Sequence, residues 1–401
     1  MRFADNLDLD TLGGLAELLS FKSALMGIPF GGARGLVCID PSKYTEEEKV
    51  LITRRFTVEM WKRSMISCST DVMCPDYGTT SKTMNIIKDT YKTLTNTNDV
   101  GIDNVVVGKS PMFGGLEGYE GSRGIGLAAS VKYITQNNTN NPKVKEFTGY
   151  NMANTKKSVI FHGFGNTGLV AAKKLLEKKD YKIIGITEGN HAVYSPIGLD
   201  PVHVKKYLEE KGTLKGYGYD ERDENTSEEI VVRRCDIVVI TTPEFSFGKD
   251  LASRVDCKFV FEGSNIPITK EANEILYKKG IIVIPDLIAS AGNQICGYIE
   301  WLKNLEHRNL TMLFKRFESK IRSQFIKLLV EEGSSTKKLK KYEGPTENDL
   351  VETTIEEMIH NAFEDSIKQA ILHNTGLRTA CYKIALERIY SSIGDDKMLL
   401  L

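Results

Sequence analysis

The sequence predicts an α/β protein whose central part forms a mostly parallel β-sheet. Two observations lead to this fold class. Short apolar runs typical of buried strands alternate with helical segments, which favours parallel pairing. The runs lie at 157–161, 181–188, 236–242, 259–263 and 281–286. A glycine-rich turn follows the first of them directly. A chain of 401 residues, 41% of them hydrophobic, is also long enough for about two to three domains.

The part of the chain before this sheet is predicted to be largely helical. Residues 44–64 are acidic at their start, basic at their end and apolar at helical spacing, which predicts a helix aligned with its own dipole. Residues 102–107 are expected to form a short buried strand, and residues 122–135 a further helix. The polar residues 136–143 then read as a loop.

The part after the sheet is expected to be helical again, from about residue 292 onward. A polar, lysine-rich stretch at 331–348 interrupts it. Residues 353–372 are amphipathic, so we expect them to pack against another domain rather than stand free.

The composition excludes several classes of partner. Lys+Arg and Asp+Glu both total 53, so there is no net charge to attract nucleic acid or an anionic membrane. A small polar or zwitterionic ligand fits this balance better. The seven cysteines form no CxxC pair and have no histidine at metal-ligand spacing, so we expect reduced thiols, no metal site, and a cytosolic or organelle-matrix location. No membrane-spanning run or export signal is recognisable.

The glycine-rich turn has the spacing of a dinucleotide-binding motif. Gly163, Gly165 and Gly168 form GxGxxG between a strand and a helix, and Glu188 ends the next strand. The first glycine allows the tight turn, the second lets the backbone approach a pyrophosphate, and the third lets the helix pack on the sheet. This context predicts a Rossmann domain. The alternative is a strand–turn–helix that binds no ligand.

The residues expected to contact the nucleotide are Gly163, Phe164, Gly165, Asn166, Thr167, Gly168 and Glu188. Glu188 would accept hydrogen bonds from ribose hydroxyl groups, and its carboxylate would repel a 2′-phosphate. NAD is therefore the expected cofactor, with NADP possible. His162, directly before the turn, reads as a packed strand-end residue rather than a base.

Two segments before the sheet resemble a known family. The stretches "FKSALMGIPFGGARG" and "DVMCPDYGTTSKTM" are similar to the glutamate, leucine, phenylalanine and valine dehydrogenase superfamily. The similarity continues through "GFGNTG", "FEGSN", "VIPDL" and "EWLKNLEH" to "NTGLRTACYKIALERIY", where the chain resembles animal-type hexameric glutamate dehydrogenases in particular.

This resemblance implies a domain order. Residues 1–135 would form the substrate domain, without its usual N-terminal part, and residues 150–300 the Rossmann domain. A shortened antenna-like helical insert at 301–350 and C-terminal helices at 351–401, which return to the substrate domain, would follow. The resemblance also implies a homo-hexamer, or co-assembly with an active paralogue, and a location in the mitochondrial matrix.

The chemistry implied by the resemblance is oxidative deamination of glutamate to 2-oxoglutarate and ammonia. It needs a clamp for a carboxylate, a base that activates water, and a carboxylate that moves protons. By position, Lys22 matches a substrate-binding lysine, Asp76 a catalytic aspartate, and Asn265 an asparagine near the cofactor. Taken alone, Lys22 could be a solvated helix residue and Asp76 a turn residue after Pro75.

Arg34 departs from the family pattern, because it stands where the family has its catalytic lysine. A buried lysine can become a free amine and act as a base, whereas an arginine guanidinium stays protonated in proteins. Arg34 can therefore polarise a carbonyl or hold a carboxylate, but it cannot accept a proton. A structural ion pair between Arg34 and Asp76 is an equally open interpretation.

Four further positions depart from the pattern. Tyr119 replaces a family arginine, and Arg123 replaces a threonine beside the nicotinamide. Gly297 replaces a serine that helps to bind the substrate's side-chain carboxylate, and Ser290 replaces an asparagine near the cofactor. Two functions follow as hypotheses. One is an impaired glutamate dehydrogenase, and the other is a catalytically silent paralogue that binds nucleotide or acts as a structural or regulatory subunit.

Overall fold

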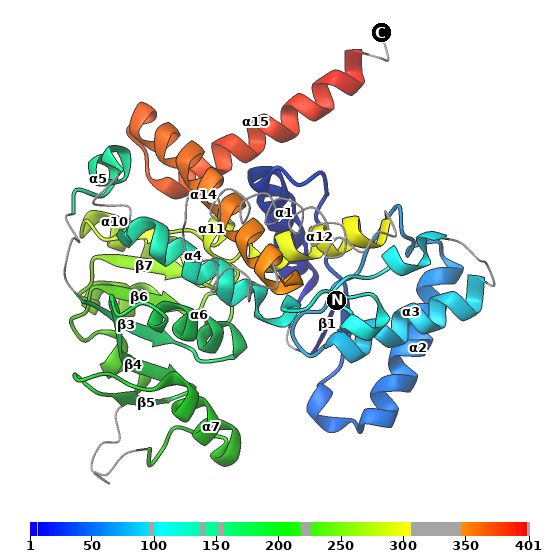
Figure 1. Cartoon of the computed structure of the whole chain (residues 1–401), viewed down its shortest axis with the longest axis horizontal. Helices are drawn as coiled ribbons and strands as arrows, with labels where there is room; N and C mark the ends of the chain where they lie inside the picture. Colours follow the sequence, from blue (N-terminus) through cyan, green and yellow to red (C-terminus); the bar gives the residue numbers. More distant parts are fainter. Residues whose placement is uncertain are drawn as a thin grey trace, which may run out of the picture. The chain divides into compact units, whose positions relative to one another are not determined.

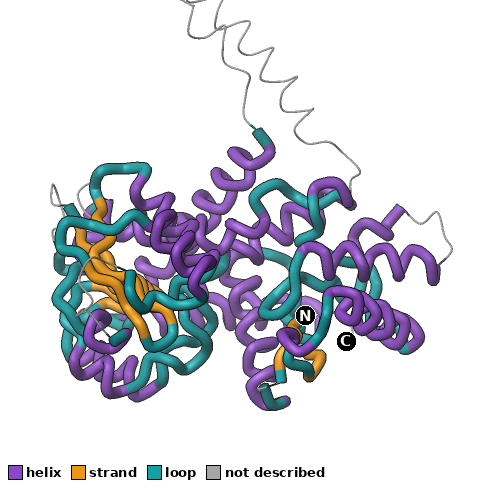
Figure 2. The backbone as a smooth tube through the Cα atoms, turned by 90° about the horizontal axis from the view of Figure 1, so that it is seen from below, coloured by secondary structure: helices purple, strands orange, loops and turns teal. Residues whose placement is uncertain are grey.

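The structure, a computed structural model, describes residues 1–5, 7–95, 100–136, 141–150, 156–217, 226–305 and 346–398. Figure 1 follows the chain by colour, and Figure 2 distinguishes its helices, strands and loops. The chain divides into two compact units. The first contains Met1–Leu12, Arg34–Tyr119 and Cys296–Thr354. The second contains Gly13–Ala33, Glu120–Ile295 and Ile355–Leu401.

The second unit is built on a six-stranded sheet with the order β5-β4-β3-β6-β7-β8. Its strands are β3 Lys157–His162, β4 Tyr181–Glu188, β5 His191–Tyr194, β6 Ile237–Ile240, β7 Phe259–Glu262 and β8 Ile282–Ile284. All neighbouring pairs are parallel except β4 and β5, which are antiparallel. The predicted α/β fold and its five strands are confirmed. The short strand β5 was not predicted.

The second unit also contains helices, three of which (α1, α12 and α14) have residues in both units. They are α1 Leu9–Met26, α4 Ser122–Gln136, α5 Pro142–Thr148, α6 Asn166–Leu176, α7 Pro201–Lys211, α8 Ser227–Val231, α9 Lys249–Arg254, α10 Lys270–Lys278, α11 Asp286–Ala289, α12 Gly292–Leu305, α14 Glu347–His373 and α15 Leu377–Met398. The helix predicted at 122–135 is confirmed as α4. The ring of Phe363 on α14 stacks on Tyr133 of α4, with the ring centroids 4.8 Å apart.

The first unit contains a two-stranded parallel sheet of β1 Arg2–Ala4 and β2 Leu36–Cys38. The helices that lie wholly in this unit include α2 Glu46–Lys62 and α3 Ser81–Thr95. The predicted helix after Pro41 is confirmed as α2. It begins with a capping box, in which Thr45 and Glu48 satisfy each other's backbone N–H groups.

The strand predicted at 102–107 is wrong. A 3-10 helix at Val100–Asn104 takes up its first half. Among the described residues, the second half pairs through a single bridge between Met73 and Val106. Val105 and Val106 are fully buried. The apolar run therefore indicated burial correctly, but burial alone does not distinguish a strand from a turn that packs inward.

Two other predicted segments lie partly outside the described residues. Residues 137–140 of the loop predicted at 136–143 lie outside the described residues. Of the rest, Gln136 ends α4, Asn141 caps α5, and Pro142 begins α5, where a missing N–H costs nothing. Most of the lysine-rich stretch, and residues 306–345 of the antenna-like insert, lie outside the described residues. The predicted domain boundaries stay predictions.

Candidate functional site

The carboxyl ends of the parallel strands of the second unit meet at one edge of the sheet. The strand order reverses between β3 and β6, which is where open α/β sheets bind ligands. Hydrogen bonds join the loops at this edge. The hydroxyl of Thr241 donates to the carbonyl of Gly163 at 2.7 Å, and the N–H of Gly263 donates to that of Ile240 at 2.7 Å.

The three glycines of the turn after β3 differ in backbone conformation and in the space around them. Gly163 has φ +85°, and an added Cβ would lie 2.9 Å from backbone atoms of Thr241 and Thr242. A Cβ on Gly168 would lie 3.2 Å from the ring of Phe164. A Cβ on Gly165 would meet nothing within 4 Å, so packing does not require this glycine. It leaves open space instead.

That open space lies at the start of α6. Gly165 is the N-cap residue of α6 and provides no side-chain hydrogen bond to the first turn. The N–H groups of a helix start attract anions such as phosphate. The open space at Gly165 and the start of α6, which no N-cap side chain covers, therefore fit the pyrophosphate of a dinucleotide.

Two titratable residues, Glu188 and His162, flank the turn. The N–H of Phe164 donates to Oε2 of Glu188, which fixes this carboxylate at the end of β4. His162 is buried, its Nδ1 lies 2.9 Å from the hydroxyl of Thr187, and burial lowers its pKa to about 4. His162 is therefore neutral near pH 7, which agrees with a packed strand-end residue.

The remaining positions of the motif connect α6 to α4. The side-chain amide of Asn166 donates to the carbonyl of Glu120 at 2.7 Å. A Cβ on Gly124 would lie 2.7 Å from the carbonyl oxygen of Thr167, so α4 and α6 approach closely at this point. Arg123 is the neighbour of Gly124 and is half-buried. The structure thus places Arg123 beside the contact between α4 and the first turn of α6.

Lys22 is brought together with two of the predicted cofactor residues. Its ammonium group donates to Oδ1 of Asn265 at 2.8 Å and to the hydroxyl of Ser290 at 2.7 Å. Only 2% of Lys22 is exposed, so the interpretation as a solvated helix residue is wrong. The ammonium group also lies 3.6 Å from Oδ2 of Asp286.

Sequence reasoning missed the charged residues around this lysine. Glu262 and Asp286 are fully buried, and Arg378 of α15 binds Glu262 at 2.7 Å. Burial raises the pKa of the Glu262 carboxyl group, and the guanidinium of Arg378 opposes part of that rise. A signal was present in the sequence, since both acidic residues stand next to apolar strand runs.

In the first unit, Asp76 binds two arginines. Nη1 of Arg34 and Nε of Arg2 both reach Oδ2 of Asp76, the latter at 2.7 Å. All three side chains are more than 90% buried. The backbone of Asp76 forms a turn with Thr79, while its carboxylate binds the two arginines. Nε of Arg34 is buried without a hydrogen-bond partner among the described residues.

No sequence pattern indicates Arg2 as a partner of Asp76. The pairing arises because β1 and β2 are parallel, with Arg2 opposite Leu36, and the N–H of Arg2 donates to the carbonyl of Gly35 at 2.8 Å. This register places Arg2 next to the turn that carries Arg34.

Tyr119 and Gly297 lie next to each other in the first unit. A Cβ on Gly297 would lie 3.8 Å from the hydroxyl of Tyr119, and a Cβ on Gly108 would lie 2.7 Å from its ring. The same Cβ on Gly108 would also touch Pro75, the neighbour of Asp76. The buried ring of Tyr119 thus fills the space beside Gly297.

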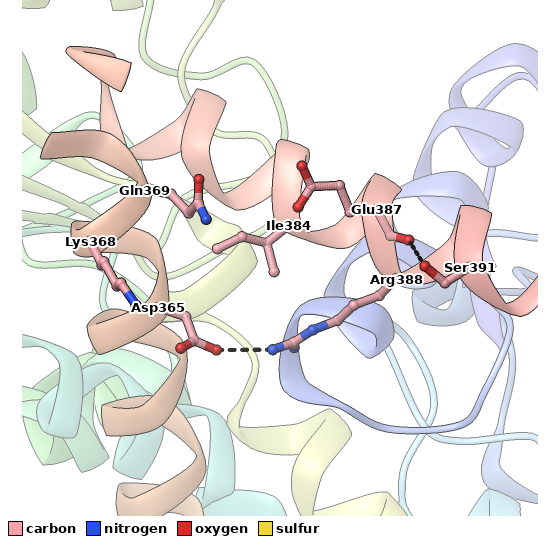
Figure 3. A pocket seen from close by; sticks show the side chains of 7 residues that line it. All are labelled: Asp365, Lys368, Gln369, Ile384, Glu387, Arg388 and Ser391. Atoms are coloured by element: carbon pink, nitrogen blue, oxygen red, sulfur yellow. Dashed lines mark hydrogen bonds and ion pairs between the residues drawn. The ribbon is translucent and has the colours of Figure 1, made fainter. Parts of the chain in front are cut away.

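A cavity of about 450 Å³ lies between α14 and α15 (Figure 3). Its lining consists of Asp365, Lys368, Gln369, Ile384, Glu387, Arg388 and Ser391. Arg388 binds Asp365 at 2.9 Å and donates to the carbonyls of Ala24 and Leu25 of α1. None of the predicted site residues lines this cavity.

Two kinds of feature are absent from the described part of the chain. Within it, no group of three or more His, Cys, Asp or Glu side chains could hold a metal ion. No helix in the same part of the chain has the length and apolar character needed to span a membrane.

Comparisons with known proteins give consistent results. Residues 114–346 match the family described as Glutamate/Leucine/Phenylalanine/Valine dehydrogenase. Residues 1–93 match the Glu/Leu/Phe/Val dehydrogenase dimerisation domain. A mitochondrial glutamate dehydrogenase of Dictyostelium discoideum is 34% identical, over 98% of this chain and 79% of its own length. A glutamate dehydrogenase of Thermotoga maritima is 30% identical, over 97% and 80% of the two chains.

The solved structures agree on the fold. The hetero-hexameric glutamate dehydrogenase of Thermus thermophilus, in its leucine-bound form, superposes with a TM-score of 0.77 at 23% identity. The match covers 96% of this chain and 79% of that one. The fold predicted from the resemblance, with a substrate domain, a Rossmann-type sheet and C-terminal helices, is confirmed.

Proposed function

This chain belongs to the glutamate/leucine/phenylalanine/valine dehydrogenase family, and from that premise we propose that it is a glutamate dehydrogenase-type oxidoreductase of impaired activity. Its reaction is the oxidative deamination of L-glutamate to 2-oxoglutarate and ammonia. The observation that carries the impairment is the pair of arginines, Arg2 and Arg34, on the carboxylate of Asp76.

The proposed cofactor is NAD, with NADP as the second choice. The bare Gly165 above the uncapped start of α6 fits a pyrophosphate, and Glu188 at the end of β4 fits ribose hydroxyl groups. Because Glu188 would face a 2′-phosphate with a like charge, NADP should bind less tightly. When bound, the nicotinamide ring supplies the acceptor for the hydride of the substrate.

Proton transfer is the step that these residues handle poorly. Arg34 cannot take a proton from the attacking water, because a guanidinium stays protonated in proteins. The oxygen Oδ2 of Asp76 that could move a proton accepts from both Arg2 and Arg34. General acid–base catalysis contributes roughly 10²–10⁴-fold to a rate, so its loss alone would make turnover very slow.

Glutamate binding is proposed to be weaker as well. Tyr119 and Gly297 occupy the positions that the resemblance assigns to a charged and a hydroxyl side chain around the substrate. In their place stand a buried aromatic ring and a backbone without a side chain. Each lost charge-assisted hydrogen bond weakens binding by about 1.5–3 kcal/mol.

The direct test follows NADH formation by the purified protein with L-glutamate and NAD. We expect turnover far below the rates usual for enzymes. Turnover on the order of 10 per second would refute the impairment. Calorimetric titrations with NADH and with 2-oxoglutarate, done separately, show which of the two binding functions the chain retains.

A second candidate function is a catalytically silent subunit that binds nucleotide or joins a homo-hexamer or a hexamer with an active paralogue. Its support is that Arg34, Tyr119, Arg123 and Gly297 all depart from the family pattern together. Native mass spectrometry of the chain alone, and mixed with an active paralogue, separates these assemblies.

We propose the mitochondrial matrix as the location, and otherwise the cytoplasm. Imaging of a tagged full-length protein tests this.

A further inference from the structure

The cavity between α14 and α15 is built by the second unit alone. Its lining comes from residues 365–369 of α14 and 384–391 of α15. A volume of about 450 Å³ lies within the range of pockets that hold small molecules. No residue that the proposed function assigns to glutamate or to the nucleotide lines it. A ligand in this cavity would therefore lie outside the proposed active site.

The charged side chains of the cavity form one pair and leave two groups over. Arg388 binds Asp365 at 2.9 Å and also donates to two carbonyls of α1, so both of these charges have partners. Lys368 and Glu387 remain. Lys383 lies 3.8 Å from Glu387, near the upper limit for an ion pair, and 59% of the Glu387 side chain is exposed. A ligand that carries one negative and one positive group would match Lys368 and Glu387.

These two charged groups lie on opposite walls of the cavity. Figure 3 shows Lys368 on α14 and Glu387 on α15, with the side chain of Ile384 between them. Ile384 is apolar and only 6% exposed, so it forms a hydrophobic floor. A ligand that reaches both charges has to cross this floor, which favours an aliphatic chain between its charged ends.

Gln369 adds a polar group that lacks a hydrogen bond. Its Oε1 is buried and has no hydrogen-bond partner among the described residues. A buried amide oxygen without a partner lowers the free energy of unfolding, and such atoms are rare in native proteins. The amide can turn about its last torsion and present this oxygen to the cavity. An ammonium group that donates to the oxygen would supply the missing partner.

We propose that this cavity binds a small zwitterion whose carboxylate and ammonium groups stand at the two ends of a short aliphatic chain, that is, an ω-amino carboxylate. The carboxylate accepts from Lys368, and the chain packs on Ile384. The ammonium group donates to Glu387 and to Oε1 of Gln369. This site lies apart from the proposed active site, so the inference does not depend on the proposed function.

The experiment titrates the wild-type chain with 5-aminopentanoate and follows binding by ligand-observed NMR. We expect a dissociation constant on the order of 1 mM, as is usual for a ligand of this size. Pentanoate and pentylamine each lack one charged end, so they should bind about tenfold more weakly. L-norvaline, an isomer whose two charged groups stand on neighbouring carbons, should also bind about tenfold more weakly. No binding of 5-aminopentanoate, or equal binding of all four compounds, would overturn the proposal.

Single charge variants show whether the ligand lies in the cavity. Lys368→Gln and Glu387→Gln each remove one partner, so the affinity for 5-aminopentanoate should fall about tenfold in both. Both side chains are exposed, so these variants should fold. The matched control is Lys278→Gln, because Lys278 is an exposed lysine of α10 outside the lining. It should leave the affinity within about twofold. Wild-type affinity in Lys368→Gln would overturn the proposal.

Gln369→Leu separates a ligand contact from a structural role. The variant removes a buried oxygen without a partner and keeps a side chain of similar size, so the melting temperature should rise by about 2–4 °C. The affinity for 5-aminopentanoate should fall at the same time. A glutamine that serves the fold alone would give a lower melting temperature and unchanged affinity, and this result would overturn its assigned role.

Competition distinguishes this cavity from the proposed active site. Excess 2-oxoglutarate and NADH should leave bound 5-aminopentanoate in place, because the cavity shares no lining residue with the proposed active site. Displacement by 2-oxoglutarate would locate the ligand at the proposed active site and overturn the inference. A chain that binds neither 2-oxoglutarate nor NADH would contradict the proposed function, while the charge variants still decide on the cavity.

Discussion

The glycine turn of the second unit and the Asp76 cluster of the first differ in how their polar groups are used. Around the turn, a Cβ added to Gly165 would meet nothing within 4 Å, and the N-cap residue of α6 provides no side-chain hydrogen bond. Around Asp76, two guanidinium groups meet one carboxylate oxygen inside the protein. The first arrangement leaves groups for a ligand, whereas the second pairs its carboxylate with two cations of the same unit. The second unit thus keeps open groups at its glycine turn, while the carboxylate of Asp76 in the first unit lies in an ion-pair cluster.

The largest expected effect reverses this difference. The double variant Arg34→Lys/Tyr119→Arg supplies an amine that can lose its proton and a cation for the substrate. Glutamate-dependent NADH formation should rise by about 10²-fold or more. The matched control is Arg54→Lys, because Arg54 forms an exposed ion pair with Asp89. An equal response of both variants would remove the special role of Arg34.

Acid should lower the free energy of unfolding through His162, which lies directly before the glycine turn. The pKa of His162 falls from 6.5 to about 4 on folding, because the ring is buried, so below pH 6.5 the unfolded chain binds a proton that the folded chain does not. Stability should fall as the pH drops from 6.5 towards 4, by about 3 kcal/mol in total. Chemical denaturation of wild type and His162→Gln across this window measures the difference. A variant with the same pH dependence as the wild type would contradict this assignment.

Removal of Arg2 from the Asp76 cluster should lower the free energy of unfolding. Arg2→Met leaves Asp76 with Arg34 and takes away one charge-assisted hydrogen bond, so stability should fall by about 1.5–3 kcal/mol. Arg54→Met is the control, and it should cost no more than about 1 kcal/mol because its ion pair is exposed. Urea denaturation measures both. Equal losses would mean that the Arg2 pair contributes no more than a surface pair.

The smallest effect separates two glycines of one motif. Gly163→Ala forces an unfavourable backbone conformation and a clash with Thr241, so it should lower stability by about 1–3 kcal/mol. Gly165→Ala meets no neighbour, so stability should change by no more than about 0.5 kcal/mol while NADH affinity falls. Thermal unfolding and NADH titration test the pair. Unchanged NADH affinity in Gly165→Ala would remove the reason for that glycine.

The sequence predicted those parts of the molecule that depend on local pattern. The five parallel strands, the capped helix α2 and the glycine turn all follow from residues that are near neighbours in the chain. The resemblance, and not the pattern, singled out Lys22, Arg34 and Asp76. Their assigned roles in substrate binding and catalysis stay proposals.

What could not be predicted depends on distant pairs. Arg2 meets Asp76 across 74 residues, and Glu262 meets Arg378 across 116. No periodicity reports such partners, because they follow from strand register and from how helices return to the sheet. The error at 102–107 has a related cause. Val105 and Val106 are buried as a strand would be, but in the described part of the chain the pairing there is a single bridge from Val106 to Met73.

The hydrogen bond from the Phe164 N–H to Glu188 has a practical consequence for changing coenzyme preference. The acid that would discriminate between the two coenzymes also anchors the loop that would carry their phosphates. An exchange of Glu188 for a small neutral residue would thus free the loop at the same moment as it admits the extra phosphate. A redesign towards NADP needs a new acceptor for that amide, such as Gln at position 188, before any cation is added nearby.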